Sequence, residues 1–171
     1  TLQVSAFRGE EFTSVRDVAF SPDGETLVSI GSTGGFPEPI VGLWEVGTGE
    51  VRAVIDEFSA GLTSLAVSPD GRLLAAGSGA EIIRVWDLRG GRPSPLGILR
   101  GHISAPTRFP GVRALAFSPD GSTLVSAGGD GTVRLWDPVE LRQLDSERMR
   151  VPAMSPYSRW PSPQTAEPWS R

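Results

Sequence analysis

The chain has 171 residues, of which 39% are hydrophobic and 21% charged, which suits one ordinary globular domain or a small repeat array and argues against disorder throughout. Sixteen basic and twenty acidic residues give a net charge of -4, whereas a general nucleic-acid binder is normally basic. No stretch reaches the roughly 18 apolar residues of a membrane helix, so we expect neither nucleic acid nor a membrane as partner.

Three absences narrow the chemistry further. The chain has no Lys and no Cys, and its one His is His102. These absences exclude a P-loop lysine, a Schiff base, a thiolate nucleophile and a disulfide, and a catalytic zinc would need carboxylates for its other protein ligands. We therefore expect no enzyme activity, no metal and no cofactor. The N-terminus shows no signal peptide, and a cytoplasmic location is our expectation.

One ten-residue segment occurs three times along the chain. It spans 15–24, 62–71 and 112–121, and each copy ends in Ser-Pro-Asp-Gly. The copies recur at the roughly 40–50-residue period of a repeat protein. Each copy is followed by a Trp, namely Trp44, Trp86 and Trp136.

Each copy is expected to form four short strands. In the third copy, the turn at 118–121 has Pro to set φ and Gly at its strained end. The next apolar run, 123–127, leads to an Asp-Gly hairpin signal, and 133–137 then alternates inward and outward residues. Segments between one Trp and the next copy, such as 51–55 and 96–99, add a fourth strand. Four antiparallel strands in about 45 residues describe a propeller blade.

Further motifs stand beside the Ser-Pro-Asp-Gly turns: Trp86-Asp87, Trp136-Asp137 and, at the head of the third copy, Gly101-His102. Together these features resemble the WD40 repeat. The resemblance implies an all-β fold of three blades in an open or partial ring. The first copy departs from the family pattern at Trp44-Glu45, where the family has Trp-Asp, and the second copy has no recognisable Gly-His.

The last part of the chain has a different composition, rich in Pro and without Gly, and is expected to be a disordered tail. Trp160 and Trp169 in this tail belong either to a motif that docks on a partner or to an overhang or truncated repeat. The predicted parts are 1–145, with repeats at about 1–47, 48–90 and 91–145, and the tail at 146–171.

The resemblance also assigns a structural tetrad in the third copy: His102, Ser126, Asp130 and Trp136. In the family such residues form a hydrogen-bonded chain that holds the blade together. Ser, His and Asp are also the members of a nucleophilic triad. A catalytic Ser sits on a strained elbow, however, whereas Ser126 lies within a predicted strand, so we favour the structural interpretation.

The other two copies have incomplete versions of this tetrad. Alignment on Ser-Pro-Asp-Gly places Ala76 and Ala80 at the Ser and Asp positions of the second copy. The first copy has Ser29 and Thr33 there. The third blade alone is therefore predicted to have the complete tetrad, and we expect it to be the most rigid.

The resemblance implies a non-catalytic protein-interaction scaffold that binds a partner through loops on one face. Candidate contacts lie in two insertions: Phe36 in the first copy, and Arg108 and Phe109 in the third. Alternatively, both phenylalanines fold back onto their own blades. A second function remains open, as the regulatory or sensor part of a larger enzyme or signalling protein. Because propellers close with roughly 4–8 blades, we expect a piece of a larger propeller or a ring of two copies.

Overall fold

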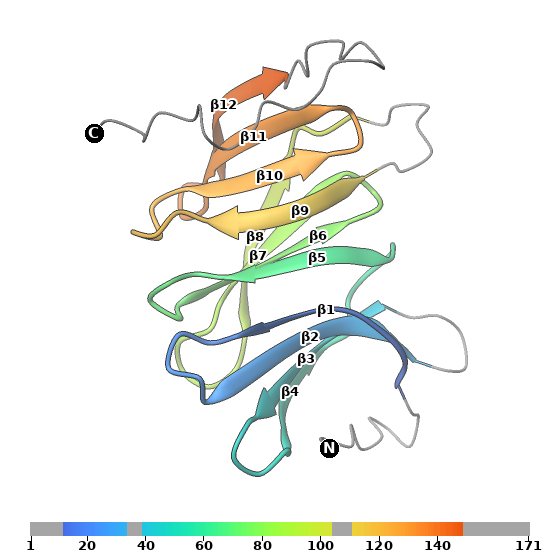
Figure 1. The fold of residues 1–171 in the computed structure, drawn as a ribbon, viewed down its shortest axis with the longest axis vertical. Helices are drawn as coiled ribbons and strands as arrows, with labels where there is room; N and C mark the ends of the chain where they lie inside the picture. Colours follow the sequence, from blue (N-terminus) through green and yellow to red (C-terminus); the bar gives the residue numbers. More distant parts are fainter. Residues whose placement is uncertain (1–11, 34–38, 104–110, 149–171) are drawn as a thin grey trace, which may run out of the picture.

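The computed structural model describes residues 12–33, 39–103 and 111–148 (Figure 1). This part of the chain contains strands and no helix, which confirms the predicted all-β fold. The strands form three four-stranded antiparallel sheets, called blades 1 to 3 in chain order. Figure 1 shows the blades one above another along the long axis, with blade 2 between the other two and no closed ring.

In every blade the spatial order of the strands equals their order in the chain, which makes each blade a simple meander. Blade 1 contains β1 (Phe12–Phe20), β2 (Thr26–Thr33), β3 (Pro39–Glu45) and β4 (Val51–Ile55). Blade 2 contains β5 (Leu62–Val67), β6 (Leu73–Ser78), β7 (Ile82–Asp87) and β8 (Ser94–Arg100). Blade 3 contains β9 (Val112–Phe117), β10 (Leu124–Gly128), β11 (Thr132–Asp137) and β12 (Arg142–Arg148).

The boundaries of the blades differ from those of the repeats predicted from the sequence, because the outer strands of blades 1 and 2 come from the start of the following repeat. β4 lies in the range 48–90, yet it pairs with β3 of blade 1, where Val41 is opposite Ile55. β8 likewise completes blade 2, and β12 of blade 3 extends to Arg148. The range 48–90 therefore supplies the outer strand of blade 1 and the three inner strands of blade 2.

The Ser-Pro-Asp-Gly motif forms the turn between the first two strands of each blade. In blade 2, the Ser68 hydroxyl donates to Asp70 Oδ1 and accepts from the Leu73 amide. The Gly71 amide donates to the Ser68 carbonyl at a φ of 71°, a conformation that favours glycine. The same contacts occur at Ser21 and Ser118. The repeated sequence therefore produces three equivalent rigid corners.

The apolar core lies between blades rather than inside any one of them. A β-sheet one layer thick has no interior, so its apolar face must pack against another layer. The core between blades 1 and 2 contains Val28, Ile30, Val41, Leu43, Leu62, Leu65, Leu74, Ala76 and Trp86. The core between blades 2 and 3 contains Ala75, Ile83, Val85, Leu99, Val112, Leu124 and Trp136. Blade 2 thus buries apolar residues on both faces.

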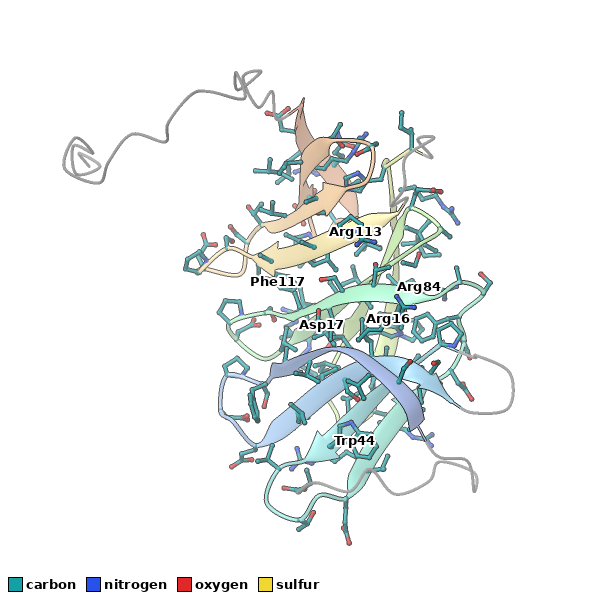
Figure 2. All side chains as sticks on the ribbon, turned by 45° about the vertical axis from the view of Figure 1, so that its right-hand side comes forward. Arg16, Asp17, Trp44, Arg84, Arg113 and Phe117 are labelled. Atoms are coloured by element: carbon teal, nitrogen blue, oxygen red, sulfur yellow. The ribbon has the colours of Figure 1, made fainter. Side chains whose placement is uncertain are left out.

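A hydrogen bond from side chain to backbone also joins each pair of neighbouring blades. Asp17 Oδ2 accepts from the Leu65 amide at 2.9 Å, and Figure 2 shows Asp17 at the boundary between β1 and β5. Ser64 Oγ accepts from the Leu115 amide at 3.2 Å across the next boundary. Asp17 and Ser64 occupy the same position of the repeat, and blade 3 has Ala114 there.

The contact between blades 2 and 3 gives a first prediction, the substitution Gly77→Ala. A Cβ atom at Gly77 would lie 2.6 Å from Val112 Cγ1 and 2.9 Å from Val112 Cβ. Because both atoms belong to a buried β-branched side chain, we expect blades 2 and 3 to be forced apart, with a loss of about 1–3 kcal/mol in urea unfolding.

The matched control for Gly77→Ala is Gly47→Ala, because an added Cβ at Gly47 meets no atom within 4 Å. This control is expected to leave the free energy of unfolding within about 0.5 kcal/mol of the parent. Equal effects of the two substitutions would contradict the close packing of blades 2 and 3 at this point.

Candidate functional site

The four side chains assigned to the tetrad form one hydrogen-bonded chain in blade 3. His102 Nδ1 lies 3.1 Å from both carboxylate oxygens of Asp130, and His102 Nε2 lies 2.7 Å from Ser126 Oγ. The Trp136 indole nitrogen donates to Ser126 Oγ at 2.8 Å. The Ser126 residue is 0% exposed and Trp136 is 1% exposed, so the chain of bonds runs through the interior.

The direction of these bonds fixes the state of the imidazole. Ser126 Oγ accepts the Trp136 N–H, so its own hydroxyl donates to His102 Nε2. The proton of a neutral imidazole then sits on Nδ1 and is donated to the Asp130 carboxylate. Burial lowers the pKa of His102, even though the neighbouring Asp130 favours the charged form. Geometry and burial thus both indicate a neutral His102.

The Asp130 carboxylate also accepts hydrogen bonds from residues outside the tetrad. Its carboxylate accepts from the Thr132 hydroxyl at 2.7 Å, the Thr132 amide at 3.0 Å and the Ile103 amide at 3.1 Å. Arg134 Nη2 lies 3.5 Å away. Burial alone would raise the pKa of Asp130, but the hydrogen bonds from Thr132, Ile103 and His102 outweigh it and hold the pKa far below the usual value.

Sequence reasoning missed Thr132 and Arg134 as members of this cluster. The available signal was their even spacing from Asp130, because residues two apart along a strand lie on the same face.

The Ser126 hydroxyl is fully buried and engaged on both sides by His102 and Trp136. A substrate has no approach to it in this geometry, which supports the structural interpretation over the hydrolase alternative.

The repeat Trp has a different environment in each blade. In blade 1, the Trp44 indole nitrogen donates to Ser29 Oγ at 2.9 Å. Ser29 therefore has the same role as Ser126. In blade 2, the corresponding position is Ala76, and the Trp86 indole has no hydrogen-bond acceptor among the residues that the structure describes.

The structure also shows an exposed apolar strand that sequence reasoning missed. Val15, Val18 and Phe20 on β1 are 52%, 53% and 61% exposed. The equivalent positions of blade 2 include Leu62 and Leu65, which are 2% and 5% exposed because they pack against blade 1. Among the described residues, blade 1 packs against blade 2 alone, and no blade covers these three positions of β1.

The predicted partner-binding residues Phe36, Arg108 and Phe109 lie outside the described residues, as do Trp160 and Trp169. Over 12–33, 39–103 and 111–148, no group of three or more His, Cys, Asp or Glu residues could hold a metal ion. Within the same ranges, no helix has the length and hydropathy needed to cross a membrane.

Comparisons with known proteins agree with the repeat pattern. The family model "WD domain, G-beta repeat" matches residues 2–35, 49–87 and 93–137, together more than half of the chain. A "WD repeat-containing protein WDS homolog" of Arabidopsis thaliana is 29% identical over 94 residues, which are 55% of this chain and 17% of that protein.

Two solved structures, of the RRP9 WD40 repeats and of U3-55K, each superimpose with a TM-score of 0.67 at 24% sequence identity. They match 78% of this chain and 38% and 39% of their own chains, respectively. Similarity at this level of identity shows the fold alone. The chain spans less than half the length of each of these three proteins.

The tetrad gives a second prediction about stability. His102→Ala and Asp130→Ala each leave buried polar groups without partners, and we expect each to cost about 2–3 kcal/mol. Ser29→Ala removes a single bond to Trp44 and is expected to cost about 1 kcal/mol. In thermal melts these losses correspond to roughly 5–10 °C and 2–4 °C for a chain of this size. Equal shifts for the three variants would contradict a special role for blade 3.

The neutral state of His102 gives a third prediction, on pH. An unfolded His takes up its proton near its usual pKa of 6.5, whereas folded His102 stays neutral to lower pH. Between these two pKa values the unfolded state binds more protons, so stability is complete above about pH 6.5 and falls as the pH decreases through this window.

Urea unfolding at pH 7.5 and 5.5 measures this effect, with His102→Gln as the comparison. Because His102 is the one histidine of the chain, the variant is expected to lose most of the pH dependence in this window. An unchanged slope in the variant would show that other groups are responsible.

Proposed function

The chain belongs to the WD40 family, whose propellers are generally protein–protein interaction scaffolds, and from this membership we propose that it acts as a non-catalytic scaffold of that kind. We propose further that one of its binding surfaces is the exposed face of β1 and that the partner on this face is another blade of the same type. The observation that carries this second proposal is the exposure of Val15, Val18 and Phe20.

The other two blades supply the argument for this partner. At the boundaries between blades, the same repeat positions are covered: Leu62 and Leu65 by blade 1, and Val112 by blade 2. An exposed apolar surface of this shape fits an apolar sheet face like those already paired in the structure. The missing blade comes either from a longer form of the protein or from blade 3 of a second copy, which would make a ring of two chains.

Loops at one end of the blades are the second proposed binding surface. Phe36, Arg108 and Phe109 are the candidate contacts there, because aromatic residues and Arg dominate binding hot spots. Such a surface would bind a protein partner, and the net charge of -4 does not favour nucleic acid. We propose a cytoplasmic location for this assembly.

A second candidate function is the regulatory or sensor part of a larger enzyme or signalling protein. It is favoured by the coverage of the relatives, since the matched region is 17% of the Arabidopsis thaliana protein and 38% of the RRP9 chain. In that case any catalysis would reside in sequence beyond these three blades. The complete reading frame distinguishes the two functions.

The blade-docking proposal gives a fourth prediction, on assembly. The 18.2 kDa chain is expected to elute in size exclusion with light scattering at the mass of a dimer. Val18→Asp and Phe20→Asp place a charge on the apolar face, and each is expected to weaken association at least tenfold, since burying one such side chain contributes about 1.5–3 kcal/mol.

Val139→Asp is the matched control, because Val139 is also exposed, at 57%, but lies in the turn between β11 and β12. It should leave the mass unchanged. A stable and soluble monomer of the parent chain would contradict docking of a second copy on β1.

A further inference from the structure

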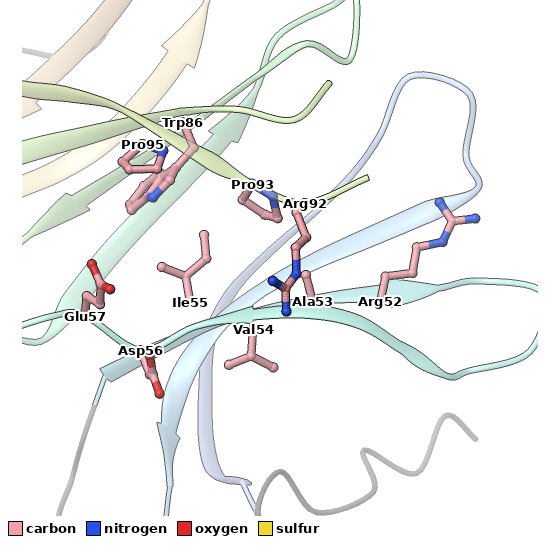
Figure 3. A pocket seen from close by; sticks show the side chains of 10 residues that line it. All are labelled: Arg52, Ala53, Val54, Ile55, Asp56, Glu57, Trp86, Arg92, Pro93 and Pro95. Carbon is pink, nitrogen blue, oxygen red and sulfur yellow. The ribbon is translucent and has the colours of Figure 1, made fainter. Parts of the chain in front are cut away.

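A cavity of about 280 Å³ opens between the outer strands of blades 1 and 2 (Figure 3). One side is formed by the consecutive residues 52–57 of β4 and the segment after it. The other side is formed by Trp86 of β7, by Arg92 and Pro93 just before β8, and by Pro95 of β8. The volume is close to the lower limit of about 300 Å³ for ligand pockets, which suits a short segment rather than a large cofactor.

The cavity runs along the free edge of β4. Successive side chains of a strand point to opposite faces, so a cavity lined by six consecutive residues follows the backbone of the strand rather than one face. β4 is the last strand of its sheet and pairs with β3 on its other side. Its outward amides and carbonyls are therefore available to an additional strand.

β4 is also the least protected of the three outer strands. β8 contains Pro95, which lacks an amide proton, and β12 contains the charged residues Arg142 and Asp145. Prolines and charges on edge strands are the usual protection against pairing with another chain. β4 has the sequence Val-Arg-Ala-Val-Ile, with high strand propensity, no Pro and one charge.

A hydrogen-bond donor without a protein acceptor in the described part of the chain faces this cavity. Trp86 is 4% exposed, and Figure 3 shows its side chain directed into the cavity toward Ile55. The equivalent indoles of blades 1 and 3 donate to Ser29 and Ser126, but blade 2 has Ala76 at that position. The Trp86 N–H has no protein acceptor among the described residues, so it can donate to an acceptor brought by a ligand at the cavity.

The charges around the cavity set the orientation of a ligand. Arg52 is held by Glu45 at 2.7 Å, whereas Arg92 has no ion-pair or hydrogen-bond partner among the described residues. Two carboxylates, Asp56 and Glu57, also line the cavity, and Figure 3 shows both on the side away from Arg92. A ligand with a carboxylate near Arg92 and no negative charge near Glu57 would match this arrangement.

We propose that this cavity binds an extended peptide of a partner protein, which adds a strand to the free edge of β4. In this mode main-chain hydrogen bonds supply affinity and side-chain contacts supply specificity. A backbone carbonyl of the peptide accepts from the Trp86 indole, and an Asp or Glu of the peptide pairs with Arg92. This inference rests on the scaffold function and names one class of partner for it.

The test begins with a random heptapeptide library displayed on phage and selected on the full chain. Binding of the selected peptides, labelled with fluorescein, is then measured by fluorescence anisotropy. We expect the selected sequences to contain Asp or Glu. Methylation of alternate backbone amides should abolish their binding, because it prevents pairing with β4.

Three variants examine the contacts. Trp86→Phe keeps an aromatic ring but removes the N–H, and Ala76→Ser gives the indole an internal acceptor like Ser29 and Ser126. Each is expected to weaken peptide binding about three- to tenfold, and Ala76→Ser to do so without loss of thermal stability. Arg92→Gln is expected to weaken it at least tenfold.

Matched controls change the same residue types outside the cavity. Trp136→Phe alters the indole of blade 3, and Arg100→Gln removes an exposed Arg at the far end of β8. Both should leave peptide affinity unchanged. Val18→Asp should do the same while it disrupts docking at β1, so failure of the blade-docking proposal and failure of this one are distinguishable.

Two outcomes would overturn the inference. The first is a selection that yields no peptide, or yields peptides that bind Trp86→Phe, Ala76→Ser and Arg92→Gln as tightly as the parent. The second is a marked gain in peptide affinity when residues 149–171 are removed, which would assign the cavity to the C-terminal segment of the chain itself.

Discussion

The packing of one blade against the next is the interaction on which the rest of the structure depends. Each sheet is a single layer, and both apolar cores lie between sheets. Blade 2 packs against a neighbouring blade on both faces, whereas blades 1 and 3 each pack against one blade among the described residues. In such an array stability comes largely from contacts between neighbours. Val15, Val18 and Phe20 of β1 are exposed because, among the described residues, no blade packs on them.

Differences among equivalent positions, rather than the shared fold, distinguish the blades chemically. In blade 1 the indole of Trp44 donates to Ser29. In blade 3 the indole of Trp136 donates to Ser126, which belongs to a larger hydrogen-bonded cluster. In blade 2 the replacement of Ser by Ala76 leaves Trp86 free to face the cavity beside β4. One conserved geometry therefore yields a structural bond in two places and a candidate binding contact in the third.

The strands and turns that depend on short-range sequence patterns could be predicted from the sequence. The strands at 51–55 and 96–99 and the turn at Ser118 follow from alternation and turn chemistry and are present in the structure. The exposure of Val18 and the cavity at Trp86 depend on which strands of different blades lie together, and no single repeat encodes that. Phe36 and Phe109, the predicted contacts, lie outside the described residues and stay predictions.

The hydrogen bonds between neighbouring blades indicate which kind of blade can pack against the open side of blade 3. At the internal boundaries, Asp17 and Ser64 accept an amide of the next blade, but Ala114 at the open end of blade 3 has no acceptor to offer. A following blade would leave its amide unpaired unless it brings its own acceptor. Blade 1 does so, because the Val18 amide already donates to Asp17 Oδ1 at 2.9 Å. Blade 1 of a second copy could therefore follow blade 3 without an unsatisfied buried amide, which supports the proposed ring of two chains.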